Sequence, residues 1–199
     1  MLIIEHRINE ASKLKLVPST HGVELDLRSN LTDIYLAHDA FTPGELFSEW
    51  LQSWGGQFLI LNVKEEGLEN RIIEILLEHK IDNYFFLDQS FPFMQRLIKR
   101  GNKNTAARIS DLESVETAIR SGAKWVWLDC FSGDWSYLRE VLPRIAETSI
   151  QSCLVAPELQ RADDNLIETQ TLKKILRETR VRIDAVCTKK PAIWENFEN

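Results

Sequence analysis

Eight short apolar runs recur along the chain, and amphipathic segments separate most of them. The runs are rich in β-branched, aromatic and aliphatic residues, as buried strands are. They span residues 2–6, 23–27, 58–63, 83–88, 106–110, 125–130, 152–156 and 184–188. Strands that alternate with helices at this spacing predict βαβ units and a parallel sheet. Eight such units favour a small (β/α)8 TIM barrel, a fold of the α/β class, over an open sheet.

The helices between these strands are predicted from their start and stop signals. We expect helices over residues 43–54, 68–79, 91–100, 112–121, 135–147 and 165–179. Pro43 is a suitable first residue for the first of these, and Asp111 a suitable cap for the fourth. Residues 8–21 have room for only about one turn of helix before Pro18. The first helix of the barrel is therefore expected to be shortened or missing.

The chain length favours one domain. Its 199 residues are enough for a substantial core, so we predict a single barrel over residues 1–199. That barrel is small, since about 250 residues is typical of the fold. Residues 190–199 look like a short tail that docks through Trp194 and Phe197. The shortened first helix is expected to leave apolar surface that a partner chain covers, which predicts a homo-oligomer.

Charge and cysteine usage argue against several classes of function. The net charge of −6 does not suit a general nucleic-acid or membrane-surface role. Three cysteines stand in apolar runs, as buried thiols of a reducing compartment do: Cys130, Cys153 and Cys187. The N-terminus lacks a basic leader before an apolar core, and no apolar stretch approaches about 20 residues. We therefore expect a cytoplasmic protein with no membrane insertion.

Polar side chains stand where the predicted strands end, which is where the active site of such a barrel lies. These residues are His6, Arg7, Glu24, Asp26, Asn62, Lys64, Asp88, Arg108, Asp129 and Glu158. Side chains two apart on a strand share a face, so Glu24 and Asp26 point the same way. Two such carboxylates repel unless a proton, a cation or a hard metal such as Mg²⁺ or Ca²⁺ lies between them. With His6 and His38 nearby, they are the parts of a metal-assisted acid–base site.

Three short segments stand in order within the first forty residues: HR, GVELDLR and LAHDAF. The chain ends with the segment RIDAVCTKKPAIW. In this order the segments resemble the glycerophosphodiester phosphodiesterase family of the phospholipase-C-like barrels. That family carries His-Arg after its first strand, Glu-x-Asp on its second and His-Asp after a short hairpin. Its closing strand is similar to the end of this chain.

The resemblance implies a metal-dependent phosphodiesterase that hydrolyses a small glycerophosphodiester or related phosphodiester. It makes His6 and His38 the acid–base pair. It makes Glu24 and Asp26 ligands of a divalent cation, Mg²⁺ or Ca²⁺, with Asn62 in the place of the family's third carboxylate ligand. In the family, a neighbouring hydroxyl of the substrate attacks first and gives a cyclic phosphate.

Five further residues are predicted to bind the substrate: Arg7, Lys64, Arg108, Asp129 and Glu158. The resemblance implies that Arg7 holds a phosphate oxygen and that Lys64 faces the phosphate or the carboxylates. An alternative for Lys64 and Arg108 is that they are ion-pair partners inside the barrel. Asp129 could border a substrate pocket, although the tryptophans that precede it on the same face are more typical of core packing.

Two departures from the family pattern leave other functions open. The family's Glu-Asn-Thr motif is missing from residues 8–21, where Asn9 and Glu10 are its nearest substitute. Asn62 is neutral, so it binds a cation more weakly than a carboxylate, and Asp88 or Asp129 is an alternative source of the missing charge. A degenerate barrel that binds a phosphorylated metabolite or a protein partner is one alternative. A lyase that releases a cyclic phosphate is another.

Overall fold

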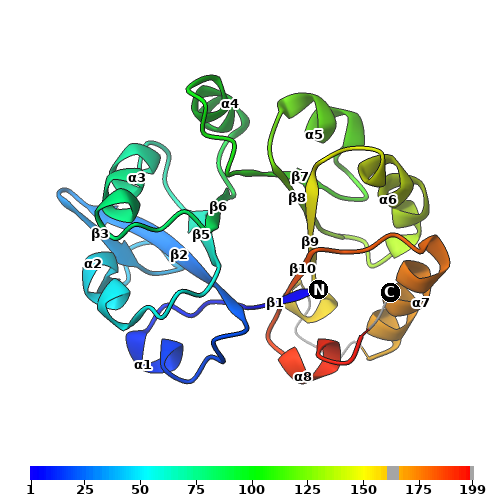
Figure 1. Ribbon diagram of the computed structural model, residues 1–199, viewed down its shortest axis with the longest axis horizontal. Helices are drawn as coiled ribbons and strands as arrows, with labels where there is room; N and C mark the ends of the chain where they lie inside the picture. Colours follow the sequence, from blue (N-terminus) through cyan, green and yellow to red (C-terminus); the bar gives the residue numbers. More distant parts are fainter. Residues whose placement is uncertain (161–165, 198–199) are drawn as a thin grey trace. The chain divides into compact units, whose positions relative to one another are not determined.

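The computed structural model describes residues 1–160 and 166–197. Its contacts divide the chain into two compact units. We call Ile4–Asn102 the N-terminal unit, and Met1–Ile3 together with Lys103–Asn199 the C-terminal unit. Each unit contains parallel strands with helices packed beside them (Figure 1).

The N-terminal unit is built around one long strand, β2. Its strands are the second half of β1 (Leu2–Glu5), β2 (Gly22–Asn30), β3 (Asp33–Leu36), β4 (Glu45–Leu46), β5 (Leu59–Val63) and β6 (Tyr84–Leu87). β2 pairs in parallel with β1 and with β5, and β5 pairs in parallel with β6. The second half of β2 turns back into an antiparallel hairpin with β3, to which β4 adds. In the β2–β5 register, Asp26 lies opposite Asn62.

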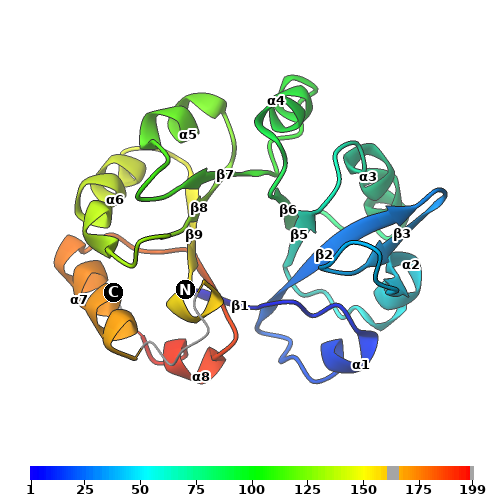
Figure 2. The ribbon, with the colours of Figure 1, turned by 180° about the vertical axis from the view of Figure 1, so that it is seen from behind.

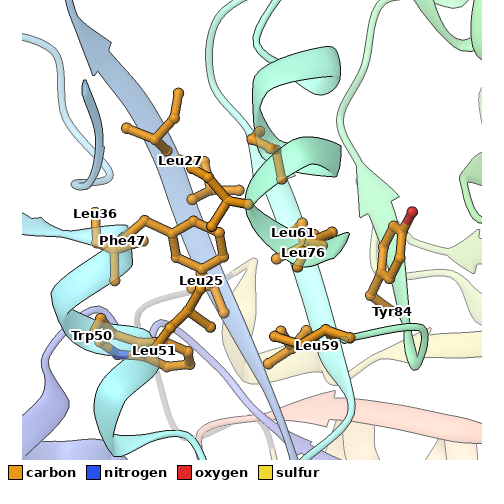
Figure 3. Close-up of a cluster of buried hydrophobic side chains, with 14 of the residues drawn as sticks. Leu25, Leu27, Leu36, Phe47, Trp50, Leu51, Leu59, Leu61, Leu76 and Tyr84 are labelled. Carbon is orange, nitrogen blue, oxygen red and sulfur yellow. The ribbon is translucent and has the colours of Figure 1, made fainter. Parts of the chain in front are cut away.

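The helices of this unit cover one face of β2 and β5. They are α1 (Ala11–Leu14), α2 (Phe47–Trp50) with the 3-10 turn η1 (Leu51–Ser53), α3 (Glu69–Glu78) and α4 (Phe91–Lys99). Figure 3 shows Leu25 of β2 and Leu61 of β5 among the buried side chains of this face, with Phe47, Trp50 and Leu76. Because side chains alternate along a strand, residues 24, 26, 62 and 64 are left on the opposite face.

The C-terminal unit is a parallel run of four strands. These are β7 (Ala106–Ile109), β8 (Trp125–Leu128), β9 (Gln151–Val155) and β10 (Ala185–Thr188), which pair in chain order. The helical segments are α5 (Val115–Ser121), η2 (Trp135–Tyr137), α6 (Leu138–Ala146), η3 (Pro157–Leu159), α7 (Leu166–Thr179) and α8 (Pro191–Trp194). Figure 2 shows α5, α6 and α7 on the same side of these strands.

The eight predicted strands are all present, whereas β3 and β4 of the described residues were not predicted. The four-residue α1 agrees with the expected shortening of the first helix. The tail docks as predicted, since Trp194 and Phe197 are buried with their ring centroids 5.7 Å apart. Among the described residues, no helix has the length and apolar character needed to cross a membrane.

Two predicted helix starts are wrong. The helix expected from Pro43 begins only at Phe47, because the preceding residues form β4 against β3. The chain passes so close to β3 there that a Cβ on Gly44 would lie 2.0 Å from the carbonyl oxygen of Leu36. The cap of α5 is Ser114 instead of Asp111, whose carboxylate accepts hydrogen bonds from two backbone N–H groups of the loop after β8.

Candidate functional site

Glu24 and Asp26 form a buried carboxylate pair on the face of β2 that lies away from the helices. Their exposed fractions are 1% and 0%. Glu24 Oε1 accepts a hydrogen bond of 2.9 Å from Asn62 Nδ2, on the neighbouring strand. Glu24 Oε2 accepts one of 2.8 Å from the backbone N–H of Arg7. The strand register thus places Asn62 beside both acids.

The carboxyl group of Glu24 is removed from water and lies beside a second buried acid. Burial raises the pKa of Glu24 to about 7, and the neighbouring charge of Asp26 adds to the rise. The hydrogen bonds from Asn62 and Arg7 and the charge of Lys64 lower the pKa of Glu24, but by less. A further cation close to Glu24 would therefore be favourable, which is an electrostatic property typical of functional sites.

Asp26 is held by three side chains. Lys64 Nζ lies 3.0 Å from its Oδ1, and Arg7 Nε lies 3.9 Å from its Oδ2. Asn9 binds residue 26 twice, since its Nδ2 donates to Asp26 Oδ2 at 2.8 Å and its Oδ1 accepts from the Asp26 backbone N–H at 2.9 Å. Lys64 is thus an ion-pair partner of Asp26.

The short segment after β1 brings His6 and Arg7 to the pair. His6 Nε2 lies 3.7 Å from Glu24 Oε2. Arg7 has a positive φ of 57°, a left-handed conformation that is uncommon outside glycine. This turn is secured because the Arg7 and Ile8 N–H groups donate to the side chain and the carbonyl of Glu24, respectively. Strain of this kind persists only where surrounding contacts compensate for it.

His38 follows β3 and is held by two neighbours. Its Nδ1 shares a hydrogen bond of 2.7 Å with Asp39 Oδ1. Arg28 donates from Nε and Nη2 to the His38 carbonyl, at 3.2 and 2.9 Å, and its Nη1 donates to Glu65. The hydrogen bond and charge of His38 lower the pKa of Asp39, and the charge of Arg7 lowers it further. The His38 loop is therefore coupled electrostatically to the segment after β1.

Sequence reasoning missed Arg28 and gave Asn9 only as the nearest substitute for a missing motif. Arg28 stands two residues after Asp26, so the period-two pattern that placed Glu24 and Asp26 on one face also applied to it. Its contact with His38 depends on the β2–β3 hairpin, which was not predicted as a pair of strands. The hydrogen bonds of Asn9 depend on an irregular loop for which no pattern exists.

The C-terminal unit holds the other three predicted substrate residues, Arg108, Asp129 and Glu158. The buried Asp129 accepts hydrogen bonds from Arg108 Nη1 at 3.0 Å and from Gln160 Nε2 at 2.7 and 2.9 Å. Its Oδ1 also accepts from the N–H of Cys130. Glu158 accepts from the Thr188 hydroxyl and from the Lys189 N–H. These carboxylates are thus occupied by partners within their own unit.

The donor set around Glu24 suits a divalent cation. No group of three or more His, Cys, Asp or Glu side chains able to hold a metal occurs within residues 1–160 and 166–197. Asn62 supplies a third oxygen instead, and its Oδ1 is buried with no hydrogen-bond partner in the described part of the chain. Two carboxylates and an amide carbonyl are ligands of the type that Mg²⁺ and Ca²⁺ prefer.

The structure of this chain is similar to known structures, whereas its sequence matches no known family. No protein-family model and no curated protein matches the chain. Over its whole length the structure is similar to a glycerophosphodiester phosphodiesterase from Thermotoga maritima, with a TM-score of 0.73, 17% identity and 98% of that chain covered. A candidate glycerophosphodiester phosphodiesterase from Galdieria sulphuraria gives a TM-score of 0.71 and 15% identity, with 96% of this chain and 94% of that chain covered. A third structure, a glycerophosphodiester phosphodiesterase from Parabacteroides distasonis, gives a TM-score of 0.67 and 13% identity, with 96% of this chain and 94% of that chain covered.

These likenesses confirm the fold class predicted from the sequence. The chain has the fold of the glycerophosphodiester phosphodiesterase structures, a small (β/α)8 barrel type with a shortened first helix. Identities of 13 to 17% mark a chain that has diverged far from the solved structures that share its fold.

Proposed function

We propose that this protein is a phosphodiesterase that uses a divalent cation and two histidines to cleave a small glycerophosphodiester or a related phosphodiester. The observation that carries the proposal is the buried Glu24–Asp26 pair with its raised pKa at Glu24. His6 lies against this pair, and Arg7 and Lys64 supply cationic groups beside it. The fold shared with glycerophosphodiester phosphodiesterases supports the same reading.

Glu24, Asp26 and Asn62 are the residues that would hold the cation, Mg²⁺ or Ca²⁺. When bound, it would neutralise charge on the phosphate oxygens. Arg7, whose side chain is 42% exposed, can add a guanidinium contact to a phosphate oxygen. Lys64 holds Asp26 in place through the ion pair between them.

His6 and His38 would move the protons of the reaction. One histidine removes the proton of a substrate hydroxyl as its oxygen bonds to phosphorus, and the other protonates the oxygen of the departing alcohol. The products are an alcohol and a cyclic phosphate, which water then opens to a monoester. Glu24 orients His6 and Asp39 orients His38, so each imidazole has a carboxylate beside it.

The test is turnover of a panel of glycerophosphodiesters with Mg²⁺, Ca²⁺ or Mn²⁺. The wild type should show turnover that falls about 10²–10⁴-fold in His6→Ala and in His38→Ala. His79→Ala is the matched control, because His79 is exposed at the end of α3 and should keep full activity. Equal rates in wild type and His6→Ala across the panel would refute the proposal.

A binding protein without catalysis is the second candidate. Asn62 favours it, because a neutral amide stands among the predicted metal ligands and donates to Glu24. Such a barrel would bind a phosphorylated metabolite or a protein partner without turning it over. Metal-dependent turnover that Asp26→Ala abolishes would exclude this candidate.

A lyase that stops at the cyclic phosphate differs only in its product. Phosphorus NMR distinguishes it from a hydrolase, because the cyclic ester would accumulate instead of opening.

The substrate-binding roles of Arg108, Asp129 and Glu158 belong to the same proposal, and a raised KM in Arg108→Ala would support them. A homo-oligomeric state is a separate proposal that light scattering tests, and a monomer would refute it.

A further inference from the structure

Two asparagine side chains touch the carboxylate pair, and they are held in different ways. The amide of Asn9 is fixed at both ends, because its Nδ2 donates to Asp26 and its Oδ1 accepts from the Asp26 N–H. The amide of Asn62 is fixed at one end only. Its Nδ2 donates to Glu24 Oε1, whereas its Oδ1 is buried and receives no hydrogen bond from the described residues.

The unused oxygen of Asn62 needs an explanation, because buried polar atoms are nearly always hydrogen-bonded. The Asn62 side chain is only 7% exposed, so bulk water does not readily satisfy it. An amide has a donor and an acceptor of nearly the same shape, and a half-turn about its terminal bond exchanges their positions. Asn9 would lose two hydrogen bonds in such a turn, whereas Asn62 would lose one.

The turned amide places an oxygen where the nitrogen now lies, 2.9 Å from Glu24 Oε1. Two oxygens at that distance repel unless a cation lies between them. Neighbouring oxygens of an octahedral Mg²⁺ site, with bonds of about 2.0–2.1 Å at right angles, are about 2.9 Å apart. The present contact between Asn62 and Glu24 thus has the length that one edge of a magnesium site requires.

We propose that Asn62 is a two-state residue that replaces the cation when the site is empty and binds it when the site is filled. In the metal-free protein its N–H group donates to Glu24 and relieves the repulsion between the carboxylates. In the loaded protein its carbonyl oxygen turns toward the cation. A carboxylate at this position could only bind, so the metal-free site would then hold three negative charges. The inference rests on the cation of the proposed function.

Side-chain amide NMR of the ¹⁵N-labelled wild type tests the turn directly. The Asn62 amide resonances are identified by their absence in Asn62→Asp, and those of Asn9 by their absence in Asn9→Asp. Mg²⁺ added to protein treated with EDTA should shift the Asn62 resonances strongly and the Asn9 resonances little. Unchanged Asn62 resonances at Mg²⁺ saturation, or no binding of Mg²⁺ at all, would overturn the proposal.

Calorimetric titration with Mg²⁺ and thermal unfolding in EDTA give a second test with a matched pair of variants. Asn62→Asp should bind Mg²⁺ on the order of tenfold more tightly than wild type and should melt at a lower temperature without metal. Asn9→Asp adds the same charge beside the same acids but loses a fixed donor, so its affinity should not rise. An Asn62→Asp variant that binds no more tightly than wild type contradicts the proposal.

These measurements are independent of turnover, so the two proposals can fail separately. If the wild type cleaves a diester while the Asn62 amide stays in place, the proposed phosphodiesterase function is supported and the two-state role of Asn62 is refuted. If the amide responds to Mg²⁺ while no diester in the panel is cleaved, the reverse holds.

Discussion

Each unit of the molecule buries a carboxylate on a strand or directly after one, but the two acids have different surroundings. Asp129 of the C-terminal unit is surrounded by donors from Arg108, Gln160 and Cys130, which engage both of its oxygens. Glu24 of the N-terminal unit lies beside a second buried acid, and its pKa is raised to about 7. A buried carboxylate is thus surrounded by donors in one unit and lies beside another acid in the other.

This difference separates a carboxylate that is expected to stabilise the folded protein from one that is expected to destabilise it. A buried carboxylate surrounded by donors stabilises its unit, and its removal leaves those donors unpaired. A buried carboxylate beside another acid destabilises its unit, so its presence points to a role outside stability. Each of the following predictions changes one cluster and leaves the other as a reference.

Lys64→Ala should have the largest effect on stability, a loss of about 3 kcal/mol in the free energy of unfolding. The substitution leaves the fully buried Asp26 without its closest cation, and breaking a buried ion pair on one side is strongly destabilising. Urea unfolding in EDTA measures the loss. Lys99→Ala, at the exposed end of α4, is the control and should change little. A loss no greater than that of the control would mean that the Lys64–Asp26 ion pair does not stabilise the protein.

Asp129→Asn should destabilise the protein by about 2 kcal/mol. Because Arg108, Gln160 and the Cys130 N–H group all donate to the Asp129 carboxylate, the new amide NH₂ must face at least one of them. Thermal or urea unfolding measures the effect, with Glu140→Gln as the control, since Glu140 is 82% exposed in a weak ion pair. An unchanged free energy of unfolding would show that Asp129 is not needed for stability, which would point to a functional role.

Glu24→Gln should have the opposite sign and stabilise the metal-free protein at pH 8 by about 1.5 kcal/mol. A pKa raised from 4.5 to about 7 corresponds to at most about 3 kcal/mol, part of which the poorer hydrogen bonds of glutamine offset. Below pH 4.5 the acid is protonated in both the folded and unfolded states, so this gain should vanish and the poorer hydrogen bonds should leave the variant less stable than wild type. Between pH 4.5 and 7 the unfolded chain loses this proton first, so wild-type stability falls relative to the variant.

The pH series of urea midpoints in EDTA decides this prediction. The exposed Glu66→Gln variant should show no such pH-dependent gain. A Glu24→Gln variant that is less stable than wild type at pH 8 would show that Glu24, like Asp129, stabilises its unit.

Mg²⁺ should have the smallest of these effects, raising the free energy of unfolding of the wild type by about 1 kcal/mol at several times its dissociation constant. The gain should persist in Asp129→Asn and disappear in Asp26→Asn, because only the N-terminal cluster is proposed to bind the ion. Differential scanning calorimetry with and without Mg²⁺ measures it. Loss of the gain in Asp129→Asn instead would place the cation in the C-terminal unit.

The parts of this site that lie on strands could be predicted from the sequence, whereas the parts that depend on loops could not. Glu24 and Asp26 were placed on one face because a strand alternates its side chains, and the structure buries both on the face away from the helices. The eight short apolar runs predicted the strands for the same reason. These inferences need only local periodicity, which a single sequence contains.

The contacts that organise the site depend on loops and on orientation. The left-handed Arg7 lets its N–H group reach Glu24, and no residue pattern signals that conformation for arginine. The helix expected from Pro43 starts late because Glu45 and Leu46 form β4, which pairs with β3. Which end of the Asn62 amide faces Glu24 depends on the surrounding charges, which follow only from the assembled strands.

β2 carries Glu24 and Asp26 and continues into the hairpin that leads to His38. A slip of one residue in its pairing with β5 would turn both acids toward the helices and would end the alignment of Asp26 with Asn62 at the same time. The two acids and the amide therefore depend on a single strand register. A molecule that pairs β2 with β5 correctly during folding brings Glu24, Asp26 and Asn62 together in one event.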